Sequence, residues 1–260
     1  MSLRLFRHLS LAAASRLVAR PASLATVVIV YLSVTAVLSS LWWAAAEAGG
    51  GSVVGYPALA LVWYAMAAEA AVVPPHPRAI EDIGDDISRG RLVPELLRPR
   101  SVLAVRVASE IGAVVTRTLA CACFGVPLVW LVAGPPPDPV ALALAGPSLL
   151  LAVILNVVVQ HAVAGVAFWL GEATSAWFLY QKLVFVLGAM LLPLQALPGW
   201  MQTVAWALPF LPMIYAPARL AAGFREPWLV ALQLAWLVVA WLVAVAVFAR
   251  GERRMVGAGA

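Results

Sequence analysis

Long apolar runs are the feature that most constrains how this chain can fold. A transmembrane helix needs about 20 consecutive, mostly apolar residues, and runs of that kind recur along the chain. Hydrophobic residues make up 64% of the 260 residues and charged residues only 11%, whereas a soluble domain carries about 25% charged residues. Because so few polar side chains cannot cover a water-facing surface, lipid must cover much of the molecule. The sequence predicts an all-α, polytopic membrane protein with one transmembrane domain over residues 1–260.

Six transmembrane helices are expected. Their predicted ranges are 24–46, 53–73, 106–132, 140–170, 177–193 and 228–249. Before the last of them, the apolar residues 194–217 contain four prolines, and proline both removes a backbone donor and clashes with the preceding turn. Non-helical backbone at membrane depth must be buried in protein or water. We therefore expect a broken, re-entrant helical hairpin on the extracellular side there, and not a seventh span.

Basic residues set the expected orientation. The N-terminal segment, the loop after the second span and the C-terminal tail hold most of the Arg residues, whereas the opposite side holds only Arg219 and Arg225. Cytoplasmic loops are enriched in Lys and Arg, so both termini are expected in the cytoplasm. Residues 2–20 are typical of an amphipathic helix in the cytoplasmic interface, in contact with membrane lipids. The net charge of +5 is explained by these Arg residues beside the spans, which set the orientation. It therefore does not indicate a nucleic-acid partner, and none is expected.

The only substantial polar segment is the cytoplasmic loop of residues 74–100. Ile80, Ile83 and Ile87 recur at helical spacing there, while four acidic residues take the other faces. One interpretation is a helix that only lies on the lipid headgroups, although anionic headgroups would repel its acids; docking of a soluble partner is the other, and the residues alone leave both open. Metal binding by the acids is not expected because they have no His partners.

Several short motifs of this chain resemble those of the permease subunits of type-2 ABC exporters. The loop carries DIGDDISRGRL from Asp82 to Leu92 and ELLRP from Glu95 to Pro99. Further motifs are FWL at 168–170, QKL at 181–183, MLLPL at 190–194, PGW at 198–200, LPF at 208–210 and YAP at 215–217. The resemblance covers roughly residues 55–225 and is similar to the bacterial branch in which two such permeases are often paired with one ATPase.

The resemblance implies a permease of the bacterial inner membrane that pairs with a second copy or a paralogue. It also implies cytoplasmic ABC ATPase subunits, which carry ATP and Mg, so no cofactor is expected in this chain. The family's coupling helix, which inserts into the ATPase, falls on residues 79–98. The implied contact residues are Ile80, Glu81, Asp82, Ile83, Asp85, Asp86, Ile87, Gly90, Leu92, Leu96, Leu97 and Arg98. Arg91 departs from the family pattern, which has an acid after the loop glycine.

Polar residues inside the spans are the candidates for a substrate path or for contacts between helices. They are Arg106, Glu110, Arg117, Asn156 and Gln160. Glu110 follows Arg106 at the i+4 position, so an ion pair between them is expected, with Glu69 as the alternative partner of Arg106. Arg117 lies deeper and is the stronger candidate for a substrate route or an inter-subunit contact. No metal site is expected, since His161 has no second His or Cys at ligand spacing.

The chain has no GxxxxGK[ST] phosphate loop and no hydrolase motif. It is therefore expected to be no enzyme, and the energy for transport must come from a partner ATPase. The apolar spans favour a lipophilic or amphipathic cargo, moved by alternating access. The alternative is a membrane enzyme or scaffold that acts on lipids. Half of a secondary transporter is a third possibility, but no internal repeat supports it.

Overall fold

The computed structural model describes residues 3–75, 79–96, 100–190 and 192–258. The fold is helical apart from one short antiparallel hairpin of β1 (Ser52–Val53) and β2 (Tyr56–Pro57). The helices are α1 (Leu3–Val18), α2 (Pro21–Ala48), α3 (Ala58–Val72), α4 (Ala79–Ser88), α5 (Val93–Leu96), α6 (Val102–Ala133), α7 (Pro139–Ala164), α8 (Ala167–Leu170), α9 (Thr174–Leu187), the 3-10 helix η1 (Leu194–Ala196), α10 (Gly199–Trp206), α11 (Phe210–Ala221) and α12 (Trp228–Ala258). The predicted all-α class is confirmed.

Four helical segments of the described chain are long and apolar enough to cross a membrane: α2, α6, α7 with α8, and α12. The pair α10 and α11, bent by 103°, makes a fifth if it counts as one span. With 15 and 14 residues, α3 and α9 measure about 22 and 21 Å, less than the roughly 30 Å of a hydrocarbon core. The count of six spans therefore stays a prediction.

Two predicted spans differ from the observed helices at their ends. The second was expected from residue 53, but the β1–β2 hairpin occupies residues 52–57 and α3 starts at Ala58. The fifth was expected to reach residue 193, but α9 ends at Leu187. Gly188 follows, and Ala189 has a φ of +59°, a left-handed conformation that cannot continue a right-handed helix.

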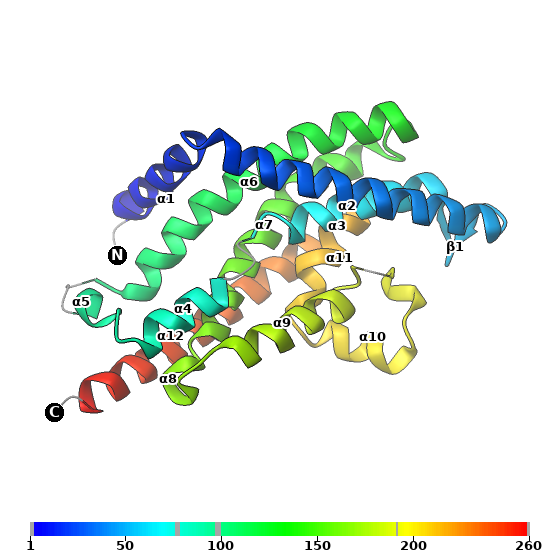
Figure 1. The fold of residues 1–260 in the computed structure, drawn as a ribbon. Coiled ribbons are helices and arrows are strands. Elements are labelled where there is room, and N and C mark those ends of the chain that lie inside the picture. The colour runs from blue at the N-terminus through cyan, green and yellow to red at the C-terminus, as the bar shows by residue number, and fades with distance from the viewer. Residues whose placement is uncertain (1–2, 76–78, 97–99, 191, 259–260) are drawn as a thin grey trace.

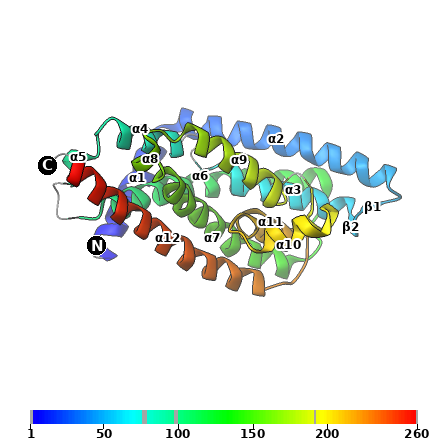
Figure 2. The ribbon, with the colours of Figure 1, turned by 90° about the horizontal axis from the view of Figure 1, so that it is seen from below.

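The core of the bundle is built around α3. Every residue from Ala60 to Ala71 is buried, because α2, α6 and α11 surround this helix (Figures 1 and 2). Small side chains allow this close approach, as is common where membrane helices pack. Between α2 and α6 the contact is closer still: a Cβ at Gly125 would overlap the Tyr31 ring.

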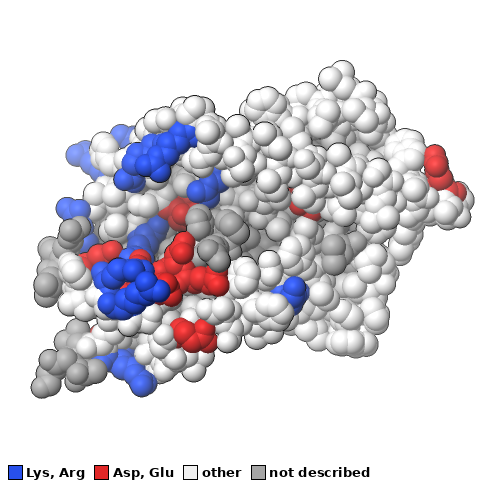
Figure 3. Space-filling view, in the orientation of Figure 1, with Lys and Arg blue, Asp and Glu red and all other residues white. Residues whose placement is uncertain are grey.

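The two ends of the bundle differ in charge. In Figures 1 and 2, α1, α4, α5 and the last turns of α12 lie at one end, and the β1–β2 hairpin lies at the other. Charged side chains gather at the α4–α5 end, while the rest of the face in Figure 3 is nearly free of them. The expected amphipathic N-terminal helix is present as α1, which packs on α6 and donates a hydrogen bond of 2.7 Å from Ser10 Oγ to the Ala108 carbonyl.

The opposite end is closed by a polar network around α11. Arg219 Nη1 donates to Tyr56 Oη at 2.6 Å and Arg219 Nη2 pairs with Glu226 Oε1 at 3.0 Å. Gln195 Nε2 donates to Tyr215 Oη at 2.8 Å, and Tyr56 Oη donates to Gln195 Oε1 at 3.1 Å. These contacts join β2, η1, α11 and the α11–α12 loop, and they hold the broken helical segment against the core. Its re-entrant, extracellular placement stays a prediction.

Candidate functional site: a charged cavity at the α4–α6 end

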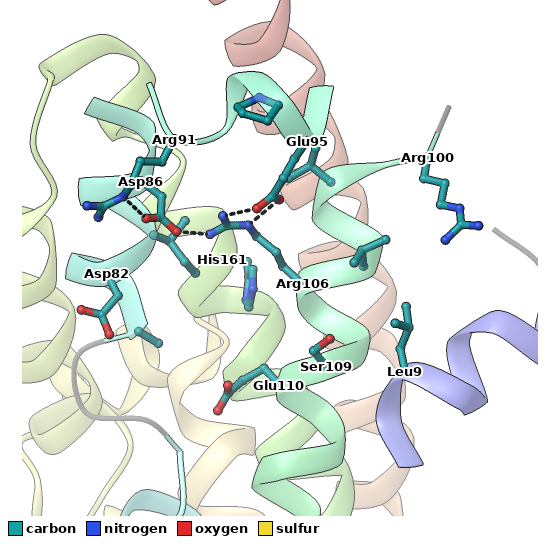
Figure 4. A pocket seen from close by; sticks show the side chains of 15 residues that line it. Leu9, Asp82, Asp86, Arg91, Glu95, Arg100, Arg106, Ser109, Glu110 and His161 are labelled. Atoms are coloured by element: carbon teal, nitrogen blue, oxygen red, sulfur yellow. Dashed lines mark hydrogen bonds and ion pairs between the residues drawn. The ribbon is translucent and has the colours of Figure 1, made fainter. Parts of the chain in front are cut away.

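A polar cavity of about 740 Å³ opens at the charged end of the bundle. Its walls come from α1, α4, α5, α6 and α7 (Figure 4). The charged and polar residues that line it are Asp82, Asp86, Arg91, Glu95, Arg100, Arg106, Ser109, Glu110 and His161. The loop of residues 74–100 and the first turns of α6, which are separate in the sequence-based prediction, therefore form one site.

The apolar stripe of α4 is turned into the molecule. Ile80, Ile83 and Ile87 are buried, and the helix lies against α7, α8 and α9. Gly84 permits this approach, since a Cβ there would lie 2.3 Å from the Cβ of Ala173. The apolar stripe predicted as a partner contact therefore anchors α4 to its own chain. The surface of α4 that remains exposed is the one that carries the charged side chains.

The outward surface of α4 carries acids. Asp82 and Asp85 are exposed, and Arg89 pairs with Asp85 at 2.9 Å one helical turn away. Both members of this pair are more than half exposed, so it contributes little to stability. Glu81 is partly buried and lies on the same helix.

The predicted coupling helix over residues 79–98 is two helices. Gly90, with a φ of +67°, ends α4 in the left-handed conformation that glycine tolerates, and α5 starts at Val93. Leu92 is buried in the turn between the two helices. Leu96 is the last residue of α5, and Leu97 and Arg98 lie outside the described residues.

Arg106 joins this helix pair to the transmembrane helix α6. Its Nε and Nη2 donate to the two carboxylate oxygens of Glu95 at 3.1 and 2.8 Å, and its Nη1 donates to Asp86 Oδ2 at 2.8 Å. Figure 4 shows the guanidinium between the two carboxylates. Such a two-pronged pair is strong and directional, so it ties α4 and α5 to α6.

The predicted partners of Arg106 were wrong. Glu110 instead pairs with Arg117 at 3.3 Å on the same helix, and Glu69 is buried with its Oε1 lacking a hydrogen-bond partner among the described residues. Spacing along one helix identifies neighbours at i+4, but both true partners of Arg106 reach it from other helices.

Asp86 is the acid shared by two arginines. It accepts from Arg91 Nε at 2.7 Å as well as from Arg106. Burial raises the pKa of Asp86, but the hydrogen bonds and charges of Arg106 and Arg91 outweigh burial and hold this pKa below its usual value. Asp86 therefore stays ionised. Arg91, which departs from the family pattern, is one of its ion-pair partners.

Of the three deeper polar candidates, Arg117 and Asn156 bond other parts of the chain. Arg117 Nη1 donates to the Pro74 carbonyl at 3.1 Å besides pairing with Glu110. Asn156 Oδ1 accepts from Tyr180 Oη at 2.7 Å, which is the contact between helices that such residues commonly make. Gln160 is buried, with its Oε1 unpaired in the described structure.

Sequence reasoning missed two residues. Glu95 was quoted in a motif but received no role, although it is the principal ligand of Arg106. Gln233 of α12 exchanges hydrogen bonds with Ser148 of α7 and donates to the Pro212 carbonyl of α11 at 2.9 Å. A polar residue within an apolar run was the available signal for Gln233, since such a residue in a membrane must find a partner.

The described chain is a multi-pass helical membrane bundle with a charged helix pair at one end. The family model described as "ABC-2 family transporter protein" matches residues 51–259, and the chain belongs to this family. It is thus a permease of an ABC transporter, a transport component that works with an ABC ATPase and not an enzyme itself. No curated protein and no solved structure matches the chain.

Proposed function

We propose that this permease is driven through the α4–α5 pair, which docks on the ATPase. The observation that supports this proposal most directly is the bridge from Arg106 to Glu95 and Asp86. The bridge is the charged connection between the helix pair and α6. An ATPase that moves α4 and α5 when it closes on ATP would pull α6 with them.

The direction we propose is export. The cavity of about 740 Å³ lies at the α4–α5 end, and the network around Arg219 closes the opposite end. A permease in this conformation is loaded from the side on which the ATPase sits and releases cargo when the outer network opens. The cargo we propose is lipophilic or amphipathic, because apolar side chains dominate the spans.

The assembly we propose has two permeases, a second copy or a paralogue being the partner, in a bacterial inner membrane with both termini in the cytoplasm. The Arg-rich α1, the α4–α5 pair and the last turns of α12 lie at the same end of the bundle (Figures 1 and 2). This arrangement agrees with the enrichment of basic residues on the cytoplasmic side.

The test is copurification of the permease with its ATPase, followed by measurement of ATP hydrolysis. Asp82→Lys with Asp85→Lys reverses the exposed charge of α4, and we expect the ATPase to be lost from the complex. Glu47→Lys is the matched control, a charge reversal at the far end of α2, and should leave the complex intact. Full copurification of the double variant would show that the acidic face of α4 is not the contact.

The bridge from Arg106 to Glu95 and Asp86 is tested separately, in the assembled complex of permease and ATPase. Glu95→Gln keeps the shape of the side chain but removes its charge. We expect the ATPase to remain bound while cargo-stimulated hydrolysis falls severalfold. Loss of binding would place Glu95 in the docking surface, and unchanged stimulation would remove Arg106 from the transmission path.

A further inference from the structure

A second hollow lies between α2, α3 and α6, at the end of α6 far from Arg106. It is a groove of about 330 Å³. Thr35, Ser39 and Trp43, each one turn apart, form its α2 wall, while Leu128 and Val132 stand on the α6 wall and Val62 lies between. Val132 is 79% exposed, so the groove is bordered by the surface that faces lipid.

Two hydroxyl groups in this groove lack the bonds that hydroxyls on helices normally make. Thr26 and Thr116 each donate to the carbonyl four residues back, and Ser40 donates to the Val37 carbonyl. Thr35 Oγ1 and Ser39 Oγ, by contrast, are buried and bond no helix carbonyl in the described structure; Thr35 is only 2% exposed and its hydroxyl lies near that of Tyr31. A buried polar group without a partner is costly, and in a membrane no bulk water supplies one.

The lining restricts the chemistry of an occupant. None of the described residues that line the groove is charged, so a bare phosphate or carboxylate would find no counter-ion there. One helical turn before Thr35 lies the buried Tyr31, whose Oη donates to the Met66 carbonyl at 3.3 Å. At the other end of the groove, Trp43 Nε1 donates to Glu47 Oε1 at 2.9 Å. The groove therefore offers apolar walls and the hydroxyls of Thr35 and Ser39, while the hydroxyl of Ser40 already donates to a carbonyl.

We propose that this groove binds an uncharged amphiphile from the membrane, whose hydroxyl or ester carbonyl bonds Thr35 and Ser39 while its hydrocarbon packs on Leu128 and Val132. Diacylglycerol is the simplest lipid with this chemistry. The proposal goes beyond the proposed function and does not depend on it, because binding to this groove needs no ATPase. Its failure would leave the ATPase contact of α4 untouched.

The experiment uses the full chain in phosphatidylcholine nanodiscs, with a photoreactive diacylglycerol as probe and mass spectrometry to locate the labelled residues. We expect saturable labelling of residues 35–43 and 128–133, competed by unlabelled diacylglycerol. Thr35→Val with Ser39→Ala removes both hydroxyls without changing shape and should weaken binding about tenfold, the effect of losing two modest hydrogen bonds. Thr26→Val, which removes a hydroxyl that bonds the Ala22 carbonyl on the same helix but outside the groove, is the control and should bind as the wild type does.

Three results would overturn the proposal. Ser39→Leu fills the groove, so labelling that persists in this variant at an unchanged melting temperature would show that the probe only samples the lipid-facing surface. Equal labelling by photoreactive phosphatidic acid would remove the preference for an uncharged group. Disulfide-linked dimers of Ser39→Cys, in a background without Cys121 and Cys123, would assign the groove to contact between two copies of the chain.

Discussion

At the scale of single residues, we expect Arg106 to contribute strongly to the stability of the charged site. Its side chain is 18% exposed and meets two carboxylates. Arg106→Ala leaves both acids without their main counter-ion, so we expect a loss of about 2–3 kcal/mol in the free energy of unfolding. Thermal unfolding in detergent measures this loss. Arg89→Ala, which breaks only the exposed pair with Asp85, is the control and should change the unfolding midpoint little.

The depressed pKa of Asp86 predicts a pH dependence. A carboxyl with a folded-state pKa below its unfolded value stabilises the fold above the unfolded value, and this contribution is lost as pH falls through the folded value. The wild type should therefore exceed Asp86→Asn in stability by a constant amount between about pH 5 and 8, and the gap should close below about pH 4. A gap independent of pH down to about 3 would contradict the ion-pair assignment.

At the scale of elements, the close packing of α4 on the bundle depends on Gly84, because glycine has no side chain. Gly84→Ala places a Cβ 2.3 Å from that of Ala173, which forces α4 outward. We expect a loss of stability of about 1–3 kcal/mol and weaker stimulation of the ATPase. Gly146→Ala is the control: nothing lies within 4 Å of the added Cβ, and the helix gains propensity.

The elements also show which parts of the fold could be predicted. The helices α6 and α12 follow from apolar runs long enough to span a bilayer. The end of α9 could not be predicted, because Ala189, a good helix former, is held at a positive φ by its surroundings. The site was only half predictable for a similar reason: Asp86 and Glu95 lie 20 and 11 residues from Arg106, beyond the reach of helical spacing rules.

At the scale of the whole molecule, the expected orientation has a direct test. Single cysteines at Ser52, Ser88, Thr203 and Arg253, in a background without Cys121 and Cys123, occupy exposed sites along the chain. A membrane-impermeant maleimide should label positions 52 and 203 in intact cells, and positions 88 and 253 only after permeabilisation. Labelling of position 253 from outside would mean that α10 and α11 cross the bilayer completely.

The enclosure of α3 has a consequence for how the protein is made. Membrane helices insert first and associate afterwards, so α3, buried from Ala60 to Ala71 in the finished bundle, begins its life in contact with lipid. Part of its cover, α11, is synthesised more than a hundred residues later. Until α11 has been made, α2 and α6 can cover this Ala-rich helix of about 22 Å only in part. The arrival of α11 is therefore the last step that encloses α3 in the bundle.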